Sequence, residues 1–117
     1  YPELTSILKK TSGLVDVLFD ALAPLAEKIE VAFVFGSVAK GTENLGSDID
    51  VLVIGDIDFT EIVTTLYSAQ TSLGREINPK IYSREEWRAC LQKQELFIQE
   101  ILNNPKLFIM GAENGLG

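Results

Sequence analysis

Residues 31–54 read VAFVFGSVAKGTENLGSDIDVLVI, and the rest of the chain is best understood as packing around them. The first five residues form an unbroken apolar run, which is typical of a strand covered on both faces. Gly36 and Ser37 follow, where the chain needs a tight turn and a close backbone approach. The loop 41–47 has the composition of a turn region, and 51–54 is again apolar. The stretch therefore predicts two strands joined by a polar loop.

Two aspartates stand at the head of the second strand. Alternation along a strand places Asp48 and Asp50 on one face, with Ile49, Val51 and Val53 on the other. Aspartate is depleted in strands, and a buried carboxylate is costly unless it is paired or bound to a metal. Their backbones lie about 6.5–7 Å apart, a spacing that can bracket one Mg²⁺ or a pair of ions. The alternative is that both aspartates simply cap a solvated turn.

The interval between the two motifs is what favours a metal site. Ten residues separate Gly36-Ser37 from Asp48-x-Asp50, which resembles the nucleotidyltransferase signature of the DNA polymerase β superfamily. The runs GSVAKG (36–41) and SDIDVLV (47–53) look like its minimal nucleotidyltransferase branch. The resemblance implies an α+β nucleotidyltransferase fold, in which a small mixed β-sheet carries helices packed mainly on one face. It also implies binding of a nucleoside triphosphate, ATP being favoured, together with Mg²⁺ or Mn²⁺.

The same resemblance assigns roles to individual residues. Asp48 and Asp50 would be the metal ligands and catalytic carboxylates. Gly36 would let the backbone approach the triphosphate, and Ser37 would offer a hydroxyl and an N–H. Lys40 stands where many relatives have arginine, so it either contacts the phosphates or is a solvated surface lysine. The implied nucleotide-binding residues are Gly36, Ser37, Lys40 and Ser47.

One position departs from the family pattern. Its members carry a third, catalytic carboxylate on the next strand, and the matching run here, INPK over 77–80, places Asn78 in that position. Asparagine can offer a carbonyl oxygen to a metal, but it supplies neither charge nor a base. Glu76 shares the strand face and is a candidate substitute one pleat away. Arg75 either pairs with phosphate or is exposed. Whether the chain is an active enzyme is therefore left open.

The flanking sequence predicts the other elements. The first is a helix that Pro24 either kinks or shortens near Leu22. In chain order there follow a helix to about 72, a strand over 76–82, a helix opened by a capping box at 83–86, a helix over 96–102 and a short strand over 106–110. Pro79 lacks an N–H donor, which predicts a strand that is either at an edge of the sheet or irregular. Trp87 is interpreted as a core anchor in preference to a platform for base stacking.

Composition limits the function classes. A length of 117 residues predicts a single domain, 1–117, and the net charge of −7 repels nucleic-acid phosphates, so we expect no direct DNA binding. The chain has no histidine and a single cysteine, which excludes imidazole chemistry, an internal disulfide and a thiolate zinc site. It shows neither a membrane-spanning run nor a signal-peptide pattern, which predicts a cytoplasmic protein with no membrane partner.

Partners follow from the resemblance alone. The run 75–79 resembles domains found behind winged-helix regions in some prokaryotic regulators, and the first residue is Tyr1, so we expect a piece of a longer chain with a fused winged-helix domain. Two function classes stay open. One is an enzyme that adds AMP to a protein or small hydroxyl acceptor. The other is a weak or inactive nucleotide-sensing or interaction module of a transcriptional regulator or toxin–antitoxin-like system. A scaffold that binds neither is the remaining alternative.

Overall fold

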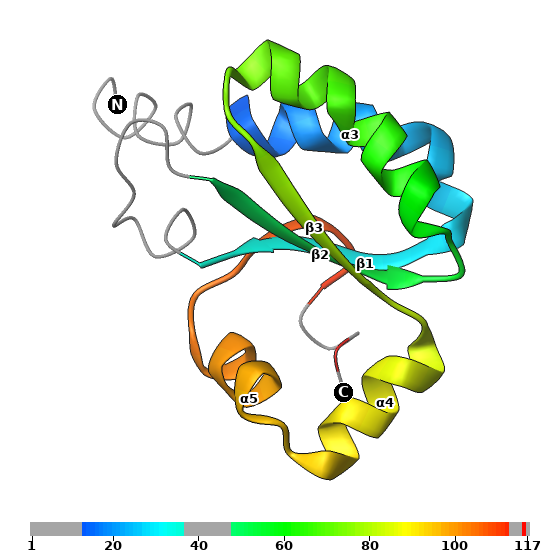
Figure 1. The fold of residues 1–117 in the computed structure, drawn as a ribbon, viewed down its shortest axis with the longest axis vertical. Coiled ribbons are helices and arrows are strands. Elements are labelled where there is room, and N and C mark those ends of the chain that lie inside the picture. Colours follow the sequence, from blue (N-terminus) through cyan, green and yellow to red (C-terminus); the bar gives the residue numbers. More distant parts are fainter. Residues whose placement is uncertain (1–12, 37–47, 113–115, 117) are drawn as a thin grey trace.

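A computed structural model of the chain describes residues 13–36, 48–112 and 116 (Figure 1). A helix over residues 13–22 leads into the elements η1 (Ala23–Lys28), β1 (Ile29–Phe35), β2 (Ile49–Gly55), α3 (Phe59–Leu73), β3 (Ile77–Tyr82), α4 (Arg84–Lys93), α5 (Leu96–Asn103) and β4 (Leu107–Met110). The described strands form one sheet in the order β3-β2-β1-β4. β1 runs antiparallel to β2 and β4, while β2 and β3 are parallel. The predicted α+β fold with a mixed sheet is confirmed.

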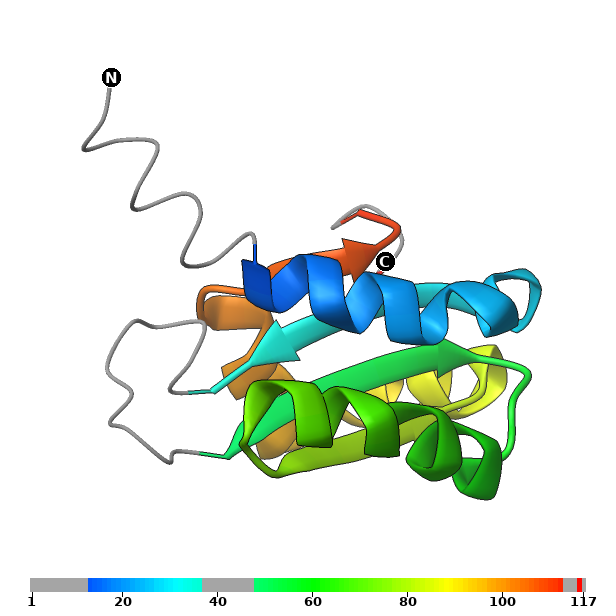
Figure 2. The same ribbon diagram turned by 90° about the horizontal axis from the view of Figure 1, so that it is seen from above.

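Helices cover both faces of this sheet. Figure 1 shows α3 and the helix over 13–22 on one side of the strands, and α4 and α5 on the other; Figure 2 shows the same layers from above. The expectation of helices mainly on one face is corrected by this arrangement. The reason lies in β1 and β2, which are buried along almost their whole length. Since successive side chains point to opposite faces, each face of these central strands is apolar and needs a cover.

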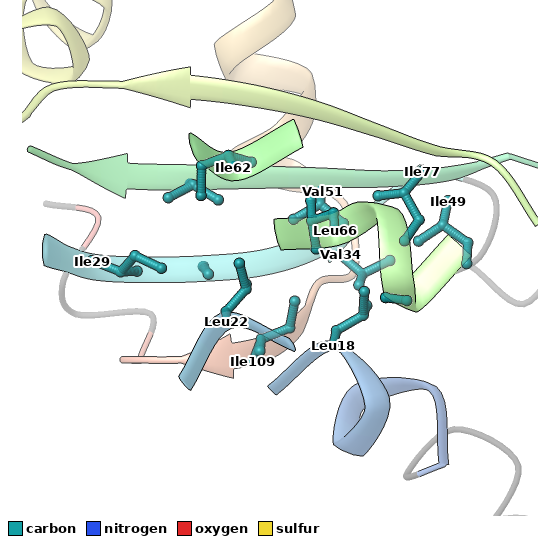
Figure 3. Close-up of a cluster of buried hydrophobic side chains, with 13 residues drawn as sticks. Leu18, Leu22, Ile29, Val34, Ile49, Val51, Ile62, Leu66, Ile77 and Ile109 are labelled. Atoms are coloured by element: carbon teal, nitrogen blue, oxygen red, sulfur yellow. The ribbon is translucent and has the colours of Figure 1, made fainter. Parts of the chain in front are cut away.

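Two hydrophobic clusters result, one on each face. Figure 3 shows the first, where Leu18, Leu22, Ile62 and Leu66 from the helices meet strand residues that include Val51. The second cluster contains buried side chains from β1, β2, α4, α5 and the C-terminal end, namely Val31, Phe33, Phe35, Leu52, Ile54, Trp87, Ile98, Ile101 and Leu116. Trp87 is fully buried, and its Nε1 donates a hydrogen bond to the carbonyl of Leu116 at 2.8 Å. Its predicted role as a core anchor is confirmed.

Local signals placed several boundaries correctly. The first helix gives way to the 3-10 helix η1, which has proline in its first turn, because proline cannot continue an α-helix. The predicted capping box is present, since Ser83 and Glu86 exchange side-chain-to-backbone hydrogen bonds at the start of α4. β3 lies at the edge of the sheet, as Pro79 predicted. None of the helices in the described ranges has the length and apolar composition that a bilayer crossing requires.

Candidate functional site

The two predicted aspartates lie where β2 begins, on the sheet face that α4 and α5 partly cover. Asp48 is exposed just before β2, and Asp50 is partly buried within it. Ile49, Val51 and Val53 point into the cluster beneath α3. Strand alternation therefore leaves both carboxylates on the opposite face, as expected. The apolar and the acidic side chains of this segment therefore lie on opposite faces of the sheet.

Three neighbouring strands meet at the level of Asp50. In the sheet register, Asp50 lies opposite Phe35 of β1 on one side and opposite Asn78 of β3 on the other. Asn78 also donates a hydrogen bond from Nδ2 to Oδ2 of Asp48 at 3.0 Å. Asn78, which the sequence analysis matched to the family's third acidic position, therefore contacts Asp48 as a neutral donor. It adds no charge and cannot accept a proton as a base.

Gly36 brings the end of β1 against Asp50. Its φ is 78°, in the left-handed region that favours glycine. A Cβ at this position would lie 2.6 Å from Oδ2 of Asp50, well inside contact distance. Conformation and space therefore both call for glycine here. The Gly36 backbone thus closely approaches the side chain of Asp50. Its predicted approach to a triphosphate stays a prediction.

The surroundings of Asp48 and Asp50 make it unfavourable for both carboxylates to be ionised without a nearby cation. Burial raises the pKa of Asp50 above its ordinary value of 3.8, the negative charge of Asp48 raises it further, and the ammonium of Lys80 opposes the shift. A cation shared by the two carboxylates would favour their ionised forms. Mg²⁺ is commonly held by one or two carboxylates together with substrate phosphates. The donor set of Asp48 and Asp50 fits that pattern.

The remaining predicted residues fall into two groups. Ser37, Lys40 and Ser47 lie outside the described residues. Glu76 precedes β3 and, with Arg75, lines a hollow at the C-terminal end of α3. Over residues 13–36, 48–112 and 116, no group of three or more His, Cys, Asp and Glu side chains is placed to hold a metal. A third protein carboxylate therefore does not join the pair within the described part of the chain.

Two residues of the site's surroundings were missed from the sequence. The ammonium of Lys80 lies 5.3 Å from the centroid of the Phe97 ring, and it acts on the charge of Asp50. A signal for Lys80 existed, because alternation along β3 places it on the same face as Asn78. Phe97 belongs to α5, and no sequence pattern shows which strand that helix crosses. Its proximity depends on tertiary packing.

Comparison with known proteins gives matches at the level of family and fold. A family model described as "Polymerase beta, Nucleotidyltransferase" matches residues 20–113. The protein of Methanocaldococcus jannaschii named "Putative protein adenylyltransferase MJ0604" is 34% identical over 58 residues, which make up 50% of this chain and 58% of that protein. The chain therefore spans less than two thirds of that relative's length.

Solved structures with a similar fold include two of toxin–antitoxin proteins. One, crystallised with AMP-PNP, has a TM-score of 0.63 at 15% identity and covers 87% of this chain and 77% of that chain. The other is a mutant of the toxin–antitoxin pair MntA–HpeT, with a TM-score of 0.61 at 14% identity, covering 86% and 75%. At such identities the likeness shows a shared fold alone.

Proposed function

The chain belongs to the polymerase beta nucleotidyltransferase family, and we propose that it binds ATP with Mg²⁺ or Mn²⁺ on the sheet face that carries Asp48 and Asp50. The observation that carries the proposal is the convergence of Gly36, both aspartates and Asn78 where β1, β2 and β3 meet. Ser37, Lys40 and Ser47 are proposed as further nucleotide contacts on the strength of their positions in the motif.

Each residue would contribute a distinct part of nucleotide binding. Asp48 and Asp50 would hold the divalent ion, which when bound offsets the charge of the triphosphate and of the leaving pyrophosphate. Gly36 leaves room for a backbone N–H to approach a phosphate oxygen, because it carries no side chain. Binding of a cation would also relieve the unfavourable burial of the Asp50 charge. We therefore expect metal and nucleotide to bind together.

Transfer of the nucleotide makes an additional demand. The acceptor hydroxyl oxygen forms a bond to the α-phosphorus, the bond from that phosphorus to pyrophosphate breaks, and the hydroxyl proton must go to a base. Asn78 cannot take that proton, and its amide already donates to Asp48. We propose that AMP transfer to a protein or small hydroxyl acceptor is slow. The name of the Methanocaldococcus jannaschii relative, "Putative protein adenylyltransferase MJ0604", favours AMP as the group and a protein as the acceptor.

A second candidate is a nucleotide-sensing or interaction module with no turnover, within a regulator or toxin–antitoxin-like system. The hydrogen bond between Asn78 and Asp48 favours it, because a neutral donor has replaced the expected base. The toxin–antitoxin context of the two solved structures is compatible with such a role. Partners of this kind, including a fused winged-helix domain, stay proposals.

Labelled AMP transfer distinguishes these candidates. Wild type, Asn78→Asp and Glu76→Gln would be compared with candidate acceptors, and pyrophosphate release would serve as a second readout. We expect Asn78→Asp to raise the rate by about 10²–10⁴-fold, the usual contribution of a general base. Strong wild-type transfer that collapses in Glu76→Gln would identify Glu76 as the base instead. Strong transfer in all three proteins would show that no third carboxylate is needed.

A further inference from the structure

A pocket of about 150 Å³ opens beside the carboxylates, between the end of β1 and α5. Gly36 belongs both to this pocket and to the contact with Asp50, so the two features adjoin. The pocket is lined by Phe35, Gly36, Phe97, Glu100, Ile101 and Asn104. Its volume is well below the ~300–1,000 Å³ of a site that encloses a drug-sized ligand. It therefore suits one ring system of a larger ligand.

An aromatic ring held in a fixed position forms part of the wall. The Phe97 side chain is 38% exposed, whereas the Phe35 ring is buried and meets it edge-on with centroids 5.9 Å apart. Edge-to-face contact at this separation is a favourable arrangement for aromatic pairs. The buried partner steadies the Phe97 ring, which keeps part of its surface open to solvent. An exposed, steadied aromatic surface is what base stacking requires.

The charged residues near the Phe97 ring differ on its two sides. A cation lies toward the carboxylates, where phosphates would bind, and an acidic residue lines the pocket, where a base would bind. The ammonium of Lys80 lies over Phe97 and also acts on Asp50, so it is close both to the carboxylates and to the pocket wall. A cation there suits the phosphates, which carry the negative charge. On the pocket side, the acidic residue Glu100 and the polar residue Asn104 line the pocket together with the apolar Phe35, Phe97 and Ile101. Such a lining disfavours phosphate and accepts a neutral ring that carries N–H donors.

We propose that this pocket receives the nucleobase of the bound nucleoside triphosphate, with the base stacked on Phe97 and the phosphates near Lys80. The inference rests on the proposed function, because it assigns the nucleoside end of the same ligand. Since every base has a π-face, stacking on Phe97 adds affinity without selecting one base. ATP and GTP should therefore lose affinity together when the ring is removed.

The test compares Mg-ATP with Mg-tripolyphosphate, which lacks a base, by calorimetric titration of wild type and variants. We expect Phe97→Leu to weaken ATP binding by about tenfold to a hundredfold and to leave tripolyphosphate binding unchanged. Phe97→Tyr keeps the ring and should keep ATP affinity. The matched control is Phe19→Leu, which changes a 45% exposed aromatic on the helix over 13–22 that packs on the other sheet face. Thermal melting checks that each variant is folded.

The possible failures are separable. Wild type that binds ATP normally, with Phe97→Leu binding it equally well, would overturn the assignment of the pocket alone. Equal losses of ATP and tripolyphosphate in Phe97→Leu would also overturn it, because the ring would then support the phosphate end or the fold. Wild type that binds neither ligand with Mg²⁺ present would contradict the proposed function itself.

Discussion

The two faces of β2 use neighbouring residues for opposite purposes. On one face, Ile49, Val51 and Val53 are fully buried beneath α3. On the other, Asp48 and Asp50 begin the strand with one exposed and one partly buried carboxylate. The first face stabilises the fold. On the second, burial and the charge of Asp48 disfavour the ionised form of Asp50, and the ammonium of Lys80 opposes this effect. Residues that stabilise the fold and residues of the proposed metal site thus alternate along the first residues of β2.

β3 repeats the division. Ile77 and Ile81 pack against the cluster beneath α3, whereas Asn78 and Lys80 lie toward the carboxylates. A register slip of one residue would exchange the faces of a strand, so the buried isoleucines also fix the position of the polar residues. The apolar face therefore fixes the position of the residues that form the proposed site.

The largest effect is expected from the apolar face. Ile49→Ala should lower the free energy of unfolding by about 2–5 kcal/mol, because a fully buried side chain is replaced by a cavity. Its neighbour Asp48→Asn, which alters an exposed side chain, should change it by about 0.5 kcal/mol or less. Urea denaturation of both variants measures the contrast. Similar losses of unfolding free energy in the two variants would contradict the proposal that only the apolar face stabilises the fold.

Gly36→Ala should cause a smaller loss of stability. Gly36 lies at the end of β1, against the side chain of Asp50. The left-handed φ costs an alanine about 1–3 kcal/mol, and the new Cβ must displace the Asp50 carboxylate. Gly74→Ala is the matched control, since Gly74 also has a left-handed φ but has open space around its Cβ. Both variants should lose stability, and only Gly36→Ala should also lose ATP binding. Retention of normal ATP affinity in Gly36→Ala would argue against the close approach as a binding feature.

The smallest effect is expected from Asp50→Asn, measured as melting temperature against pH without divalent ions. Because the folded-state pKa of Asp50 is raised, its contribution to stability is fully present below its ordinary value of 3.8 and is lost as pH rises through the raised folded value. Asn does not titrate, so the variant should melt higher than wild type at neutral pH, and this difference should vanish below pH 3.8.

Asp16→Asn, an exposed change on the helix over 13–22, controls for the loss of one negative charge. An Asp50→Asn curve parallel to that of wild type at all pH values would mean that the Asp50 carboxylate carries no such cost.

Much of this arrangement could be predicted from the sequence because its signals are local. The apolar runs on either side of Gly36, the alternation that separates Asp48 from Ile49, and the proline that marks β3 as an edge strand all act within a few residues. The assignment of Asn78 to the family's third acidic position also uses a local signal, the run 77–80, and it stays a prediction. Ser37, Lys40 and Ser47 stay predictions.

The features that could not be predicted depend on contacts between residues far apart in the sequence. The spacing of apolar residues such as Trp87 and Ile98 predicts that α4 and α5 each have a buried side, but it does not predict which face of the sheet they cover. For the same reason, the sequence did not predict that Phe97 lies near the proposed site. The hydrogen bond from Asn78 to Asp48 depends on the parallel register of β2 and β3, which no local pattern encodes.

The most direct test of the central claim, that Asp48 and Asp50 form a metal-dependent nucleotide site, is calorimetric titration with ATP in the presence and absence of Mg²⁺. Wild type should bind ATP only with the ion present, and Asp48→Asn/Asp50→Asn should lose measurable binding while staying folded. Asp16→Asn/Asp20→Asn removes the same charge from exposed positions and should bind as wild type does. Equal ATP affinity in wild type and Asp48→Asn/Asp50→Asn, or wild-type binding that ignores Mg²⁺, would contradict the claim.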